Sequence, residues 1–185
     1  LAGVASAWVR SSTEVPEQEQ QATDSEHMSR EFRLQVQEWK NVLIRGSQPE
    51  KLQKHLAAFN EEAATVAMMA ADLAKNMDDR QAAALAAQFG KEHQALTDSY
   101  RGALAAFEAA QFDPHAGDEL VRGMDRAPTQ TLEALIKRAK DVADVAVIKK
   151  SDDARRTLVW SGLIALAAAV ALVVSLAWWI RRSVI

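Results

Sequence analysis

The longest apolar run in the chain is LVWSGLIALAAAVALVVSLAWWI, from Leu158 to Ile180. It contains no charged residue and no proline. As an α-helix rising about 1.5 Å per residue, it is long enough to cross the ~30 Å hydrocarbon core of a bilayer. A helix also allows a single segment to satisfy its own backbone hydrogen bonds in lipid. We therefore predict a transmembrane helix over residues 158–180, rather than the core helix of a soluble protein.

Tryptophans lie just inside both ends of this run and arginines lie just outside, as at the ends of membrane-spanning helices. They are Arg155, Arg156 and Trp160 on one side and Trp178, Trp179, Arg181 and Arg182 on the other. We assign residues 10–157 to a domain outside the membrane, and residues 181–185 to the start of the segment beyond it.

A second apolar stretch, LAGVASAWV, occupies residues 1–9. Trp8 followed by Arg10 is typical of a helix leaving a membrane, which favours the tail of a first transmembrane helix. The alternative is that Ala5-Ser6-Ala7 forms the small-residue end of a signal peptide. The polar residues 11–26, rich in Glu and Gln, fit either a helix or a stalk.

Between these stretches, apolar residues recur every three or four positions, which is the period of an amphipathic helix. The first stripe comprises Met28, Phe32, Val36, Trp39 and Leu43. The second, a heptad pattern, comprises Leu52, Leu56, Phe59, Ala63, Val66, Ala70, Leu73 and Met77. The third comprises Leu85, Phe89, Leu96, Ala103 and Phe107. The fourth comprises Leu120, Met124, Leu132, Leu135, Ala139 and Val142. Four stripes predict four helices.

Turn signals separate the first two stripes. We expect Gly46 to end the first helix as a C′ glycine. Ser47 is expected to cap the next helix, with Pro49 in its first turn and Glu50 reaching back in a capping box. This pattern predicts a tight turn between two antiparallel helices.

Two further cap signals mark the next boundaries. Asp78, three residues before Gln81, predicts a turn near residues 76–80. Asp113-Pro114 predicts the N-cap and first residue of the fourth helix, after a third helix that ends near Phe112.

The fourth predicted helix leads into the membrane. Pro128 is expected to kink or interrupt it, and no breaker follows before Arg156. Short turns make neighbouring helices antiparallel. The predicted fold is therefore all-α: an antiparallel up-down-up-down four-helix bundle that continues into a transmembrane helix, with the turn at residues 46–49 at the far tip.

Three stretches resemble the sensory region of bacterial methyl-accepting chemotaxis proteins. They are VQEWKNVLIRG at residues 36–46, GMDRAPT at residues 123–129 and WWIRRSVI at residues 178–185. The resemblance implies a periplasmic or extracellular sensory bundle anchored in the inner (cytoplasmic) membrane, with residues 181–185 beginning a HAMP linker. The chain holds no methylation helices and no kinase-coupling tip, so the same input on a membrane histidine kinase or a diguanylate cyclase is an alternative.

Composition narrows the function classes. The 185 residues carry a net charge of −3, whereas a nucleic-acid-binding domain needs a basic face. The absence of cysteine excludes disulfides and zinc–thiolate sites. With 7 glycines and 4 prolines, the chain favours helix over sheet.

No catalytic motif occurs in the sequence: HExxH, GxGxxG, the P-loop and GxSxG are all missing. The Glu-x-x-His spacing of di-iron bundles is also missing, because none of the four histidines has a glutamate three positions earlier. We therefore predict a protein that is not an enzyme and that has neither a cofactor nor a metal site.

A candidate ligand site emerges from counting residues along each predicted helix from the far tip. The residues at a similar depth, about seven to eleven positions down, are Trp39, His55, Arg101, Arg122 and Arg126. Two or three guanidinium groups at one level suit a carboxylate or another small anion, bound bidentately. The alternative is that the arginines are solvated and paired with nearby acidic residues, namely Glu38, Glu108, Glu119 and Asp125.

These patterns lead to one functional expectation. The chain is expected to sense a small anion, such as an organic acid, and to pass binding across the membrane by a shift of the fourth helix. A homodimer is expected, since a second helix pair gives the fourth helix something to shift against. The alternative of a different class is a membrane-anchored adaptor bundle without a ligand.

Overall fold

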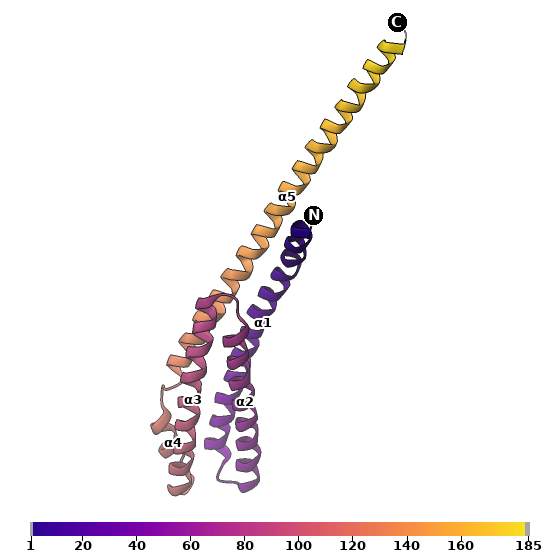
Figure 1. Ribbon diagram of the computed structural model, residues 1–185. Coiled ribbons are helices and arrows are strands. Elements are labelled where there is room, and N and C mark those ends of the chain that lie inside the picture. The colour runs from indigo at the N-terminus through magenta and orange to yellow at the C-terminus, as the bar shows by residue number, and fades with distance from the viewer. Residues whose placement is uncertain (1, 184–185) are drawn as a thin grey trace.

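The computed structural model describes the backbone of residues 2–183 and the side chains of residues 17–182. Over this range the chain forms five helices and no strand: α1 Ala2–Arg45, α2 Pro49–Asn76, α3 Arg80–Ala109, α4 Pro114–Val121 and α5 Arg126–Ser183 (Figure 1). The predictions for Leu1 and residues 184–185 lie outside the described residues, as do those for the side chains before residue 17.

The helices close into a bundle. α1 packs against α2 and α5, and α3 packs against the same two helices, while α4 lies chiefly on α3. α4 and the first part of α5 together therefore take the place of one long fourth helix (Figure 1). The all-α antiparallel four-helix bundle predicted from the sequence is confirmed.

The bundle core consists largely of the predicted stripes. The fully buried side chains include Phe59 of α2 and both Phe89 and Phe107 of α3. Phe32 meets Phe89 edge-on, with the ring centroids 5.5 Å apart. The exceptions are Leu120 and Met124, predicted on the fourth stripe, which are exposed to 52% and 48%. They lie where the helix breaks, so its periodicity does not continue through them.

The turn between α1 and α2 differs in detail from the prediction. The N-cap of α2 is Gln48 and not Ser47, Pro49 is the first helical residue, and no side chain makes a capping hydrogen bond. Gly46 is also not a left-handed C′ residue. Its role is spatial: a Cβ atom there would lie 2.3 Å from the Val42 carbonyl oxygen and 2.8 Å from Phe107. The far tip is therefore close-packed.

The cap of α3 lies one residue later than predicted, at Asp79, whose side chain accepts a hydrogen bond from the Ala82 N–H at 2.9 Å. The α4 prediction is correct, since Asp113 is the N-cap and Pro114 the first residue. α3 itself ends at Ala109, three residues before Phe112. Phe112 has a φ of 66°, so it cannot continue a right-handed helix.

The break in the fourth helix precedes Pro128 instead of occurring at it. Residues 122–125 form a turn in which Gly123 has a φ of 74°. α5 then starts at Arg126, so Pro128 lies in its first turn. Backbone N–H groups in a first turn have no intrahelical partner, and the proline therefore removes no hydrogen bond. The expected kink at Pro128 is wrong: this residue helps to start α5.

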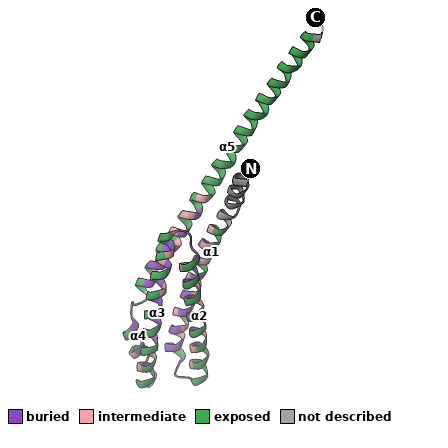
Figure 2. Cartoon of the chain, viewed as in Figure 1, coloured by how far each residue is buried: buried purple, intermediate pink, exposed green. Residues whose placement is uncertain are grey.

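Beyond the bundle, α5 continues as a single exposed helix (Figure 2). Its apolar part is long and hydrophobic enough to span a membrane, and none of this part is buried within the chain. Arg182 lies over the Trp178 ring, 5.1 Å from the ring centre, at the far end of the span. Lipid is the environment that suits such a surface.

Candidate functional site

The five predicted site residues fall into two groups. Trp39 and His55 are buried in the bundle, where they are 3% and 7% exposed. The three arginines, Arg101, Arg122 and Arg126, are all exposed. The buried pair lies at the α1–α2 side of the core, while the arginines belong to α3, the α4–α5 turn and the start of α5.

Trp39 belongs to an aromatic cluster inside the bundle. Its ring centre lies 4.9 Å from that of Tyr100 and 6.1 Å from that of Phe59. Tyr100 and Phe59 meet edge-on at 5.4 Å, so the three rings form one layer. The indole Nε1 of Trp39 has no hydrogen-bond partner among the described residues. Burying a polar N–H without a partner costs free energy, so the atom is available to an additional acceptor.

His55 connects α2 to α1. Its Nδ1 lies 2.6 Å from Oε2 of Glu38, whose other carboxylate oxygen accepts a hydrogen bond from Asn41 at 3.1 Å. Because a carboxylate only accepts, His55 donates from Nδ1. Glu38 is thus held by a partner on each side. This arrangement joins the two helices near the aromatic layer.

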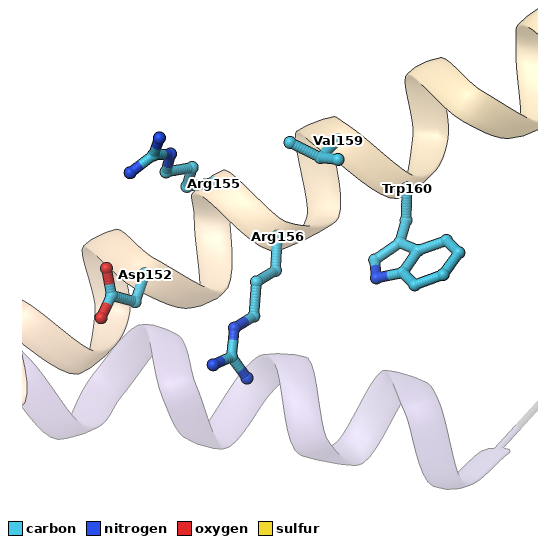
Figure 3. Close-up of a pocket in the computed structure, with 5 residues that line it drawn as sticks. All are labelled: Asp152, Arg155, Arg156, Val159 and Trp160. Atoms are coloured by element: carbon cyan, nitrogen blue, oxygen red, sulfur yellow. The ribbon is translucent and has the colours of Figure 1, made fainter.

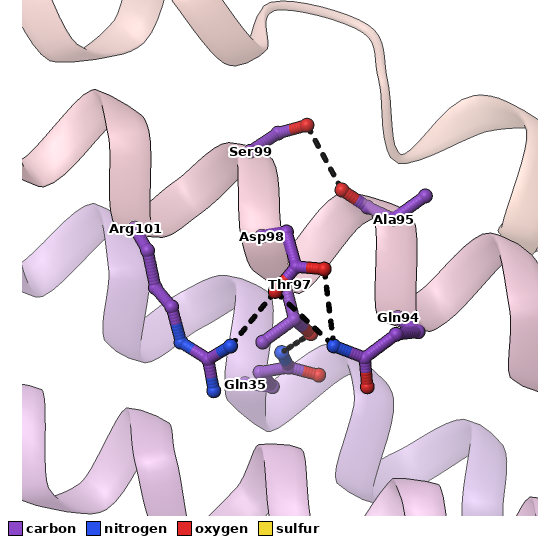
Figure 4. Close-up of polar contacts among 7 residues, drawn as sticks. All are labelled: Gln35, Gln94, Ala95, Thr97, Asp98, Ser99 and Arg101. Atoms are coloured by element: carbon purple, nitrogen blue, oxygen red, sulfur yellow. Dashed lines mark hydrogen bonds and ion pairs between the residues drawn. The ribbon is translucent and has the colours of Figure 1, made fainter.

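Arg101 and Arg122 are each paired with an acidic residue on the same stretch of chain. Arg101 donates to Asp98 at 2.8 Å, and Asp98 also accepts from Gln94 (Figure 4). Arg122 donates to Asp118 at 3.2 Å. Both pairs are more than half exposed, so they are screened by solvent and contribute little to stability. A ligand carboxylate would compete with these acidic side chains for the guanidinium groups.

Arg126 is the first residue of α5 and faces the α4–α5 turn. Its Nε lies 3.5 Å from the point that a Cβ atom of Gly123 would occupy. It therefore lies beside the first turn of α5, where the helix dipole favours an anion. In this turn the Arg126 N–H already donates to the Gly123 carbonyl at 3.3 Å and Pro128 has no N–H, so among the described residues only the Ala127 N–H has no backbone partner.

A buried polar network between α1 and α3 was not predicted from the sequence. Nε2 of His93 lies 2.7 Å from Oε1 of Gln35, and Nε2 of Gln35 donates to Thr97 at 3.3 Å. Figure 4 shows Gln35 and Thr97 facing each other between α1 and α3. Burial lowers the pKa of His93 to about 4, so it is neutral near pH 7. Its Nδ1 has no partner among the described residues.

A second titratable cluster lies where α1 faces α2. Burial, together with a hydrogen bond and repulsion from Glu31, raises the pKa of Glu62 to about 6. Glu31 in turn lies 2.9 Å from Nε2 of His27. The two carboxyl groups can therefore share one proton across the helix interface. Among the described residues, no group of His, Asp or Glu side chains is arranged to hold a metal ion.

A cavity of about 590 Å³ lies near the membrane-proximal end of α1 and α2. Four carboxylates contribute to its lining: Glu17, Asp24, Asp72 and Asp78. Such a lining repels an anion, so this cavity does not fit the ligand predicted from the sequence.

The fold defines a class of protein in which a helical bundle is joined to a helix long and apolar enough to span a membrane. Comparison with known proteins narrows this class. The methyl-accepting chemotaxis protein CtpH of Pseudomonas aeruginosa is 32% identical to the chain over 159 residues, which are 84% of this chain and 27% of the relative. The chain spans just over a quarter of that relative. No protein-family model and no solved structure matches the chain.

The resemblance found in the sequence is thereby confirmed: over most of its length, the chain is a homologue of a methyl-accepting chemotaxis protein. Such proteins are receptors and not enzymes, which supports the prediction that this region has no catalytic role. The chemoreceptor homology and the apolar part of α5 together identify it as a membrane protein.

Proposed function

We propose that this chain is the ligand-sensing and signal-transducing region of a transmembrane chemoreceptor. The single observation that supports this most strongly is the length of α5, which runs unbroken from Arg126 in the bundle to Ser183 beyond the apolar segment. A continuous helix is stiff along its axis, so a small shift of its bundle half reaches the far side of the membrane.

The proposed ligand is a small anion, most simply an organic acid, bound near the break between α4 and α5. Arg122 and Arg126 lie on either side of Gly123 in this break, and the Ala127 N–H in the first turn of α5 has no backbone partner among the described residues. Binding there would favour one arrangement of α5 relative to α1 and α3, its two packing partners. Differential affinity for two arrangements is what allows a ligand to shift an equilibrium.

The proposal includes two statements about assembly. The bundle lies on the outer side of the inner (cytoplasmic) membrane, with Arg181 and Arg182 on the cytoplasmic side. The chain acts as a homodimer, in which the second copy supplies the surface against which α5 moves. The homology to a chemoreceptor supports both.

Calorimetry on the full chain in lipid nanodiscs tests the site. Organic acids and inorganic anions would be screened at millimolar concentration, and each hit repeated with Arg122→Ala and Arg126→Ala. Losing a charge-assisted arginine–carboxylate contact should weaken binding by about tenfold. Lys54→Ala, an exposed cation on α2, is the matched control and should leave the affinity unchanged.

Two results would count against the proposal. A hit that neither arginine substitution weakens would place the site elsewhere. No hit at all, with helix content and thermal unfolding showing a folded chain, would favour a ligand-free adaptor or sensing through a partner protein.

A further inference from the structure

A second basic site lies far from the proposed ligand site, at the border between the bundle and the apolar part of α5. A cavity of about 310 Å³ is lined there by Asp152, Arg155, Arg156, Val159 and Trp160 (Figure 3). All five side chains are exposed, and Trp160 is 65% exposed. None of the proposed anion-sensing residues contributes to this cavity.

The position of this site relative to a bilayer follows from the sequence. The apolar segment begins at Leu158, so Arg156 lies within about 5 Å of the hydrocarbon edge along the helix axis. Trp160 lies one turn further in, on the same face as Arg156, and Figure 3 shows both side chains extending from one side of α5. Headgroup phosphates occupy this depth, and tryptophan favours it as well.

The chemistry of the lining selects for a phosphate group. A guanidinium group binds a phosphate bidentately, and the indole N–H of Trp160 can donate to an ester oxygen. Among the described residues, neither Arg155 nor Arg156 forms an ion pair, so both guanidinium groups can bind an added anion. The lining contains two guanidinium groups and a single carboxylate, Asp152, so the site has a net positive formal charge.

We propose that Arg155, Arg156 and Trp160 form a binding site for the headgroup of an anionic phospholipid in the leaflet that adjoins the bundle. An anionic lipid such as phosphatidylglycerol neutralises the net charge of this site, whereas a zwitterionic lipid brings no net charge. Asp152 can accept hydrogen bonds from the hydroxyl groups of a glycerol headgroup. The bound lipid would fix the depth and rotation of α5 where it enters the membrane.

Energy transfer to labelled lipids tests this site in the full chain. The sequence has no cysteine, so Ser161→Cys gives a single attachment point for a donor fluorophore beside Trp160. The chain is reconstituted in phosphatidylcholine bilayers with a trace of acceptor-labelled phosphatidylglycerol or acceptor-labelled phosphatidylcholine. The ratio of the two transfer efficiencies measures the enrichment of the anionic lipid near residue 161.

In the labelled chain with Arg155 and Arg156 intact, we expect a clear enrichment of phosphatidylglycerol. The Arg156→Gln variant should reduce this enrichment on the order of fivefold, and the double variant Arg155→Gln with Arg156→Gln should reduce it further. Lys149→Gln with Lys150→Gln is the matched control, because it removes the same charge more than a turn further from the membrane. It should retain most of the enrichment. Circular dichroism confirms that each variant keeps its helix content.

Three results would overturn the proposal. Equal transfer to both lipids would show that no anionic lipid is selected. An equal loss in the lysine and arginine double variants would show a diffuse surface attraction and no site. Loss of the enrichment on adding inorganic phosphate, compared with chloride at the same ionic strength, would identify free phosphate as the ligand.

Discussion

The two halves of α5 have the same backbone and opposite surroundings. In the bundle half, Leu132 and Leu135 are at most 2% exposed, whereas the neighbouring Glu133 is exposed to water. In the outer half, Leu166 and Leu172 are 63% and 69% exposed, and the apolar run between the flanking arginines has no polar face. The first pattern buries a stripe against protein, while the second presents an apolar surface on every side. The difference indicates that the bundle half of α5 is suited to packing against protein, and the outer half to contact with lipid.

The largest effect is expected from a matched pair of substitutions on this one helix. Leu135→Ala removes a fully buried side chain and should lower the free energy of unfolding of the bundle by about 2–5 kcal/mol. Leu166→Ala makes the same chemical change in the outer half and should alter it by less than about 0.5 kcal/mol. Denaturant unfolding of the chain in nanodiscs, followed by near-ultraviolet circular dichroism, measures both. Equal losses would mean that the two halves do not differ as described.

The pH dependence of stability further distinguishes the buried interior of the bundle from its exposed surface, because a low-dielectric core shifts the pKa of a buried group. Folding keeps His93 neutral down to a pH of about 4, while an unfolded chain protonates its histidines near 6.5. The unfolded state therefore binds more protons between these values, and this residue's contribution should lower the free energy of unfolding by about 2 kcal/mol as the pH falls from 7 to 5.

The His93→Gln variant should lose this contribution, measured as the change in unfolding free energy between pH 7 and pH 5. Gln can still bond with Gln35, so the network is not simply removed. His115→Gln, at an exposed position, is the control and should leave the difference between the two pH values unchanged. An identical pH response in wild type and His93→Gln would contradict a buried neutral histidine.

A smaller effect is expected at the membrane-proximal end of the bundle, where Asp79 caps α3 and pairs with Arg138 of α5 at 2.5 Å. The hydrogen bond from Arg138 lowers the pKa of Asp79 to about 2. Its stabilising effect is present above the ordinary carboxyl pKa of about 4 and is lost as the pH falls through the folded-state pKa. Asp79→Ala should cost about 1 kcal/mol through the lost cap.

Arg138→Gln separates the two roles of Asp79, because it keeps the cap and removes only the ion pair. Acid unfolding of this variant should depend less on pH between about 4 and about 2 than that of the wild type. If Arg138→Gln and Asp79→Ala lower the free energy of unfolding by the same amount at pH 7, the N-cap hydrogen bond of Asp79 contributes nothing to stability.

The smallest effect is expected from Glu62→Gln. The raised pKa of Glu62, about 6, means that the folded state favours the protonated form. The stabilising effect of that proton is fully present below the ordinary pKa of about 4.5 and is lost as the pH rises through 6. The Gln variant should therefore melt slightly higher than the wild type at pH 8, with the advantage disappearing at pH 4. Glu61→Gln, at the exposed neighbouring position, is the control and should show a weaker effect.

The sequence predicted the contrast within α5 and most of the core, because apolar periodicity directly reports which side a helix buries. It missed His93 and Tyr100, although both fill gaps in the α3 stripe between Phe89, Leu96 and Ala103. A search for apolar residues alone passes over polar side chains at core spacing. Reading every third or fourth position regardless of polarity would have found them.

The candidate site was less predictable than the fold. Counting depth along four straight helices assumes that each is continuous, and the turn at residues 122–125 breaks this assumption for Arg122 and Arg126. Depth also does not specify direction around a helix axis. Trp39 and His55 therefore point into the core, while Arg101 lies on the surface.

The central claim is that the bundle and the residues beyond the apolar segment lie on opposite sides of a membrane. Single cysteines at Gln94 and Ser183 test it most directly, because the sequence has no other cysteine. In intact cells, an impermeant thiol reagent should label Gln94→Cys, and should label Ser183→Cys only after the membrane is opened. Labelling of Ser183→Cys but not Gln94→Cys would reverse the topology, and labelling of both in intact cells would show that α5 does not cross the membrane.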